Sequence, residues 1–373
     1  MPLPVFDAVD AGVAAVVVAR SSEADRNRRL PPETVGVLAD SGAFQLGLPV
    51  ALGGPGLSPG EVLQRIASLA RLDGAAGWCS MISSTTSTLA AFLSAEIAAD
   101  TFGKGRCYGG VFAPNGRFTV DGSCATLSGR WQWGSGLQHC DVVVAGAIGP
   151  DGERRTFILD VGDVEVVDTW HTMGMRGSGS VDFIASDVNV DLQRSVAQIR
   201  PRPIADEPLS HFPNFALLAA SVAAVAAGIA AHAIDECRTI ATDRRPQFSS
   251  RLLAEHAAVQ SSMSRANVTL GSAIRHLWAE VEDAWQLILS GDRVGVPQRV
   301  AIRAAAAHLV EVSATVTDDM FTAAGGNAVY ETSHLGRCLR DAHVVRQHIM
   351  VAPRLHETLG RHLLGLELDD AMI

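Results

Sequence analysis

The chain has 373 residues, of which 47 % are hydrophobic and 19 % charged. This predicts about two or three domains with a large apolar core and excludes a disordered chain. Its 30 Lys and Arg residues against 40 Asp and Glu residues leave a net charge of −10, and no basic block occurs, so we expect no nucleic-acid partner. Six scattered cysteines without a Cys-x-x-Cys pair predict reduced thiols, no metal site and a cytoplasmic protein.

The N-terminal part has the pattern of a helical domain, which we assign to residues 1–104. Pro31-Pro32 opens an expected helix over 33–41, and Ser58-Pro59-Gly60-Glu61 is typical of another helix start. Between them, residues 48–57 form a loop rich in glycine and proline, which leaves no room for a helix.

The middle of the chain changes to short β-rich runs separated by turn signals such as Asp121-Gly122. We assign residues 105–206 to a small antiparallel β-domain, because the runs do not alternate with helices. The expected strands cover 118–120, 142–145, 155–159 and 164–167.

The C-terminal part, residues 207–373, is helical again and predicts an antiparallel four-helix bundle. The uncharged run 215–234 is long enough to span a bilayer, but its alanine content favours a helix inside the bundle, so we expect no membrane partner. The four expected helices cover about 214–242, 252–289, 297–323 and 337–366.

Several common enzyme motifs do not occur in the sequence. It contains no Gly-x-Gly-x-x-Gly after a strand, no phosphate-binding P-loop, no His-Glu-x-x-His and no Gly-x-Ser-x-Gly. Rossmann dehydrogenases, P-loop NTPases, zinc proteases and α/β-hydrolases are therefore not indicated.

Four motifs are instead placed along the helix–sheet–helix order. They are Gly129-x-Trp131-x-Trp133-x-Ser135-Gly136-x-x-His139, then Gly174-Met175-Arg176-Gly177-Ser178-x-Ser180, then Arg245-x-x-Phe248, and finally Gly325-Gly326 with Arg337-x-x-Arg340-Asp341. Together they resemble the acyl-CoA dehydrogenase superfamily over most of the chain. The resemblance is greatest to its flavin-dependent monooxygenase branch, the oxygenase components of two-component hydroxylases.

The resemblance implies an α+β, mostly α, fold with an N-terminal α-domain, a central antiparallel β-domain and a C-terminal four-helix bundle, assembled as a homotetramer. A flavin, FMN or FAD, is expected between the β-domain and the bundle. Trp133 would lie against its ring system, Ser135 would hold its N5 edge, and Arg245 would reach a cofactor phosphate across a subunit interface. The expected cofactor-binding residues are Trp133, Ser135, Arg176, Ser178, Ser180, Arg245 and Phe248.

The last motif distinguishes two chemistries within this superfamily. Dehydrogenases carry a catalytic glutamate at positions that correspond here to Ile349 or, counted back from Arg245, to Ala219. Neither residue can abstract a proton, which acyl-CoA desaturation requires. The monooxygenases have a histidine that corresponds to His348. We therefore expect His348 and Ser135 to be the catalytic residues, with His348 acting as a base or supporting the oxygenated flavin.

Three further residues are candidates for substrate binding: Trp78, Thr86 and Phe112. Several monooxygenase relatives have a second histidine where this chain has Thr86, which cannot act as a base near neutral pH. Hydroxylation of phenols is therefore in doubt, and oxygenation at nitrogen or sulfur stays open. His139 follows the monooxygenase pattern, and both a structural and a site role remain open for it.

The leading hypothesis is an oxygenase component that receives reduced FMN or FAD from a separate flavin reductase. It would transfer one oxygen atom from O₂ to an aromatic or heteroatom-containing small molecule. An acyl-CoA dehydrogenase with FAD and an unrecognised base, or a non-catalytic member of the fold, are the alternatives.

Overall fold

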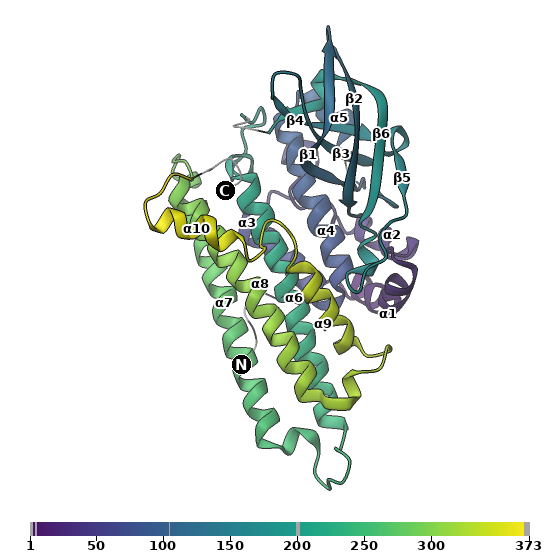
Figure 1. The fold of residues 1–373 in the computed structure, drawn as a ribbon, viewed down its shortest axis with the longest axis vertical. Helices are drawn as coiled ribbons and strands as arrows, with labels where there is room; N and C mark the ends of the chain where they lie inside the picture. Colours follow the sequence, from purple (N-terminus) through teal and green to yellow (C-terminus); the bar gives the residue numbers. More distant parts are fainter. Residues whose placement is uncertain (1–2, 4–5, 104, 199–201, 369–373) are drawn as a thin grey trace.

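The computed structural model describes residues 3, 6–103, 105–198 and 202–368, and its elements follow the helix–sheet–helix order (Figure 1). A group of short helices comes first, a seven-stranded sheet follows, and long helices form an elongated bundle below the sheet (Figure 1). This is the expected mostly helical α+β architecture. The domain boundaries at residues 104 and 206 stay a prediction.

Five helices precede the sheet in the chain, and the expected start signals occur at α2 and α3. Ser58 accepts the backbone N–H of Glu61, whose carboxylate in turn accepts the N–H of Ser58, so a capping box begins α3. The next helix, α4, begins where the Asp73 side chain accepts a backbone N–H. The bounds are α1 Ala11–Asn27, α2 Pro32–Asp40, α3 Pro59–Leu72, α4 Gly74–Ser87 and α5 Ala95–Thr101.

The strands form one sheet in the order β5-β6-β2-β1-β3-β4-β7. All neighbours are antiparallel except β1 and β3, which run parallel. The prediction of an antiparallel sheet was therefore wrong for one pair of neighbouring strands. The reason is the connection, because β2 and the turn after it carry the chain across to the other side of β1. The bounds are β1 Tyr108–Asp121, β2 Cys124–Gly134, β3 Val142–Ile148, β4 Arg154–Asp160, β5 Glu165–Val167, β6 Val181–Asp191 and β7 Ser195–Ala197.

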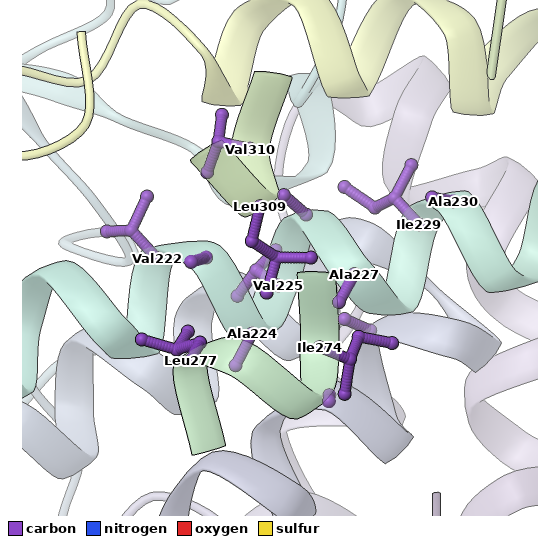
Figure 2. Close-up of a cluster of buried hydrophobic side chains, with 14 of the residues drawn as sticks. Val222, Ala224, Val225, Ala227, Ile229, Ala230, Ile274, Leu277, Leu309 and Val310 are labelled. Atoms are coloured by element: carbon purple, nitrogen blue, oxygen red, sulfur yellow. The ribbon is translucent and has the colours of Figure 1, made fainter. Parts of the chain in front are cut away.

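Helix α6 is the central helix of the bundle, and its small side chains let its neighbours approach closely. Figure 2 shows Val222 and Val225 of α6 among Ile274 of α7 and Leu309 of α8, all of them buried. The bounds are α6 Asn214–Asp243, α7 Ala257–Leu289 and α8 Val296–Ala324.

Two of these helices, α6 and the stretch Val296–Ala328 that contains α8, are apolar and long enough to cross a membrane. The most apolar part of each stretch is largely buried inside the protein, 89 % of it in α6 and 72 % in the second stretch. Both therefore have the burial of core helices in a soluble protein, as we expected for α6. The second stretch was not noticed in the sequence.

The final helix of the bundle is broken, which corrects the single helix expected over 337–366. Helix α9, His334–Val345, ends where the backbone N–H of His348 bonds to the carbonyl of Val345, a tighter turn than an α-helix makes. Proline at position 353 then prevents an uninterrupted continuation, and α10 starts only at Leu355–Leu363. His348 consequently lies in a turn and not on a helix.

Candidate functional site

Three buried serine hydroxyls form a hydrogen-bonded chain at one end of the sheet. Ser135 Oγ lies 2.7 Å from Ser180 Oγ, which lies 2.7 Å from Ser178 Oγ. All three side chains are at most 4 % exposed. They meet because the end of β2 pairs with the start of β6, Gly134 opposite Val181, and because Gly136 N–H donates to the carbonyl of Ser178 at 3.0 Å.

Trp78 of α4 connects this serine chain to His348. Its indole N–H donates to Ser135 Oγ at 2.9 Å. Its rings meet the imidazole of His348 edge to face, with centroids 5.5 Å apart. Ser135, Trp78 and His348 thus come together from the turn after β2, from α4 and from the turn after α9, so the site lies where all three parts of the chain meet.

His348 is partly buried, and its surroundings hold it in the neutral form. Burial away from water and, to a lesser extent, the positive charge of Arg303 on α8 together lower the pKa of its imidazole to about 4. A neutral ring can both donate and accept a hydrogen bond, but at this pKa it holds an extra proton weakly. The chemistry favours a hydrogen-bonding support over a strong general base.

Arg303 is 2 % exposed, and burial lowers its own pKa only to about 10, so it keeps its charge at neutral pH. Arg303 belongs to none of the motifs that the sequence presents. One signal was available: Arg303 follows Val300 by three residues, on the apolar stripe of an otherwise alanine-rich helix. A charge on that stripe has to lie in the protein interior.

Trp133 projects from the end of β2 with 68 % of its surface exposed. A register shift between Trp131 and Gly134 and a left-handed backbone conformation at Trp133 (φ 68°) turn it away from the core. Trp131, two residues earlier, is instead fully buried and stacked on Phe183. An exposed indole face two residues from the Ser135 hydroxyl fits a flat heterocyclic ligand.

Arg176 points away from the serines, although its segment carries Ser178 and Ser180. Its guanidinium donates to the carbonyl of Asp25 on α1 at 3.0 Å and to the carbonyl of Thr172. These contacts fasten the segment between β5 and β6 to the first helix. A cofactor contact for Arg176 stays a prediction.

Arg245 and Phe248 lie in the loop between α6 and α7, at the end of the bundle opposite the sheet (Figure 1). Arg245 donates to the carbonyl of Ser250, and the side chain of Phe248 is 99 % exposed, with φ 62°. Within one subunit, therefore, the Arg245-x-x-Phe248 motif does not contact Ser135, Ser178 and Ser180.

The remaining candidates lie in different surroundings. Thr86 is buried in the last turn of α4. Phe112 packs with Tyr108 and the apolar cluster under α5, and its carbonyl accepts the Gln198 amide. His139 follows Ser135 by one turn and packs near Phe44, with ring centroids 5.9 Å apart. Among the residues that the structure describes, no hydrogen bond or ring contact joins any of the three to the Ser135–Trp78–His348 group.

Part of the C-terminal region of the chain matches a known family. Residues 220–353 match "Acyl-CoA dehydrogenase, C-terminal domain". This stretch covers most of α6, all of α7, α8 and α9, and the turn that carries His348.

Two curated relatives match almost the whole chain. Indole-3-acetate monooxygenase of Pseudomonas putida is 29 % identical over 369 residues, 97 % of this chain and 94 % of that protein. The oxygenase subunit HsaA of a flavin-dependent monooxygenase of Mycobacterium tuberculosis is 25 % identical, over 95 % of this chain and 94 % of its own length.

A solved structure confirms the fold. XiaF from Streptomyces sp., in complex with FADH₂ and glycerol, superposes with a TM-score of 0.89 over 96 % of this chain and 94 % of XiaF, at 22 % identity. The expected acyl-CoA dehydrogenase fold is thus confirmed, and the relatives confirm the expected resemblance to monooxygenase oxygenase components.

Proposed function

We propose that this chain, a member of the acyl-CoA dehydrogenase superfamily and an enzyme of its flavin-dependent monooxygenase branch, is the oxygenase component of a two-component system. Its substrates are reduced flavin, O₂ and an aromatic small molecule. The observation that carries the proposal is the meeting of Ser135, Trp78 and His348 beside the exposed indole of Trp133.

The residues present fit a flavin. Trp133 offers an aromatic face for the ring system, and the serine chain offers hydroxyl groups for its polar edge. Trp78 donates to Ser135, so Ser135 Oγ already accepts one hydrogen bond. If Ser178 donates to Ser180 and Ser180 to Ser135, the Ser135 hydroxyl proton is free to be donated to the flavin N5 edge. The bound flavin supplies the reaction with O₂.

The neighbouring residues give the protein two further tasks. Burial of Ser135, Ser178 and Ser180 keeps water away from the reacting edge, and neutral His348, in contact with Trp78, offers a hydrogen-bonding group. Desaturation of an acyl-CoA lacks support, because Ile349 and Ala219 occupy the two positions where dehydrogenases hold their base.

The low pKa of His348 and the name of a relative together support one substrate class. A phenol reacts readily only after deprotonation, and His348 with a pKa of about 4 is a weak proton acceptor. An indole ring is electron-rich without losing a proton. A relative is named for indole-3-acetate, which carries this ring together with a carboxylate. We therefore propose an indole carboxylate as the substrate class.

A flavin reductase is the partner that a separate oxygenase component requires. We further propose a homotetramer in the cytoplasm. Two observations support a cofactor contact made across a subunit interface. Within one subunit, the Arg245–Phe248 loop lies away from the three serines, and the side chain of Phe248 is 99 % exposed.

The test is rapid mixing of protein loaded with chemically reduced FMN or FAD with oxygenated buffer. We expect the absorbance of oxidised flavin to return more slowly than for free flavin, and Ser135→Ala and His348→Ala to speed its return by about tenfold, since a hydrogen bond to a charged or reacting group contributes ~1.5–3 kcal/mol. Ser128→Ala on β2, the strand that precedes Ser135, and His343→Ala on α9 are the matched controls. Return as fast as for free flavin would overturn the proposal.

Two additional measurements separate the alternatives. Indole-3-acetate should be oxygenated in preference to its neutral amide and to simple phenols, as judged by product analysis. The oxidised, FAD-loaded protein should not be bleached by acyl-CoA esters under anaerobic conditions, and bleaching would instead establish a dehydrogenase.

A further inference from the structure

A second cluster of reactive side chains lies behind the serine chain. Cys107 directly precedes β1, and His139 with Cys140 ends the turn that starts at Ser135. One ligand atom from each of the three residues lies within 4.8 Å of the other two, and the two sulfur atoms are 3.5 Å apart. Cys107 and His139 lie 32 positions apart in the chain, which explains why the sequence showed no ligand spacing.

The imidazole of His139 provides an independent observation. Its Nε2 atom is buried and has no hydrogen-bond partner in the described part of the chain. Buried polar atoms are nearly always paired, so an unpaired nitrogen beside two thiols indicates a missing ligand. The backbone leaves space for one: a Cβ atom on Gly136 would lie 3.3 Å from Nε2 and 3.4 Å from the Cys140 sulfur, but Gly136 has none.

The distances suit a metal ion better than a disulfide. Two thiolates about 2.3 Å from a tetrahedral zinc ion are about 3.8 Å apart, whereas sulfurs in a disulfide are about 2.05 Å apart. The observed 3.5 Å is close to the first value. Two thiolates and a neutral imidazole would also balance the charge of a divalent cation, which a buried site requires.

Cation binding would take both thiols as thiolates, so Cys107 and Cys140 would release their protons when the metal ion binds.

We propose that Cys107, His139 and Cys140 bind one thiophilic divalent cation, Zn²⁺, with a solvent ligand in the space beside Gly136. The proposal does not depend on the oxygenase activity. The cation would tie the turn that carries Ser135 to the start of β1. In that turn His139 N–H donates to the carbonyl of Gly136, and Gly136 N–H donates to the carbonyl of Ser178. The site would thus be structural and would hold Ser135 and Ser178 in register.

The first experiment measures metal in the full-length protein purified without chelators. We expect about one zinc per chain, and, after removal of the metal under reducing conditions, a thiolate-to-cobalt charge-transfer band when Co²⁺ is added. Bound Zn²⁺ should also raise the melting temperature. Substoichiometric zinc together with no such band on Co²⁺ titration would overturn the proposal.

Variants identify the ligands. Cys107→Ser and Cys140→Ser should abolish the cobalt band, whereas Cys124→Ser, which changes an exposed cysteine on β2, should leave it intact. In case the buried variants fail to fold, the wild-type protein is alkylated with and without Zn²⁺. Zinc should protect Cys107 and Cys140 from modification, and equal modification of both samples, or a Cys107–Cys140 disulfide that forms despite zinc, would contradict the assignment.

Discussion

The indole of Trp78 stands between the two residues that we propose to be catalytic: its N–H donates to Ser135 Oγ at 2.9 Å, and its ring meets that of His348 with centroids 5.5 Å apart. A single side chain from α4 thereby fixes the separation of a hydroxyl from the sheet and an imidazole from the bundle. The orientation of Ser135 depends on this donor, because Trp78 occupies one lone pair of its oxygen.

Replacement of Trp78 by phenylalanine should keep the aromatic packing and remove the hydrogen bond. Ser135 then loses its orientation, and we expect the reduced flavin in the complex to be reoxidised by O₂ about tenfold faster, with more peroxide per product, since one hydrogen bond to a polar group is worth ~1.5 kcal/mol. Stopped-flow absorbance and peroxide assays measure both quantities.

The matched control is Trp278→Phe in α7. The Nε1 of Trp278 has no hydrogen-bond partner among the described residues, so this replacement removes the same atoms without a bond. Equal effects of the two variants would mean that the Trp78–Ser135 hydrogen bond does not matter for the reaction.

The low pKa of His348 predicts how stability depends on pH. The unfolded chain takes up the proton near the ordinary pKa of 6.5, but the folded chain only near 4, so acidification between these values favours unfolding. The stabilisation that neutral His348 contributes to the folded protein is fully present above pH 6.5 and is lost as the pH falls towards 4. The loss amounts to up to about 3 kcal/mol, because each tenfold difference in proton affinity is worth ~1.4 kcal/mol.

Urea unfolding of the wild type and His348→Gln between pH 7 and 4.5 measures this effect. The variant should lose less stability on acidification than the wild type, with His308→Gln on α8 as the control for an exposed histidine. Parallel curves for wild type and His348→Gln would show that His348 titrates near its ordinary pKa.

A hydrogen bond to Asp341 should hold the segment that carries Ser178 and Ser180 rigid. Its buried carboxylate accepts the backbone N–H of Met175 at 2.5 Å, and Met175 has the left-handed conformation with φ 51°. Asp341→Ala leaves that N–H buried and unpaired, so we expect unfolding to become easier by about 1–3 kcal/mol and flavin to bind more weakly. Denaturant titration and flavin fluorescence measure the two losses.

Asp341→Asn is the decisive companion variant, because its amide oxygen can still accept the same N–H. Burial raises the pKa of Asp341 to about 7, so the folded protein already tolerates an uncharged group at this position. The asparagine variant should therefore keep most of the stability and flavin affinity. Asp319→Ala, at an exposed position on α8, should be silent.

The sequence predicted the order of helices and strands because local signals determine them. The capping box at Ser58 and the alanine-rich pattern of α6 are contained in a few consecutive residues. The parallel pairing of β1 with β3 was not predictable in this way, since it depends on how the chain passes from β2 on one side of β1 to β3 on the other side. The break before α10 was missed although proline at position 353 signals it.

The candidate site was predictable only residue by residue. The motifs identified Ser135 and His348 separately, but their common neighbour Trp78 comes from another helix, 57 residues before Ser135. The charge of Arg303 and the grouping of Cys107 with His139 likewise depend on contacts between distant segments. Tertiary packing creates these contacts, and no single stretch of sequence contains them.

The crossing of α3 and α6 provides a test of the packing that supports the site. A Cβ atom on Gly228 of α6 would lie 2.4 Å from the carbonyl oxygen of Ala67 and 2.6 Å from the Cβ of Ala70, both on α3. A backbone oxygen cannot move aside without moving the helix. Gly228→Ala should therefore destabilise the protein by about 1–3 kcal/mol, although alanine favours a helix by itself. Gly360→Ala in α10, where the new methyl group meets open space, should instead stabilise it by about 0.5–1 kcal/mol. Urea unfolding of both variants measures the difference, and a stabilised Gly228→Ala protein would mean that the two helices do not approach each other this closely.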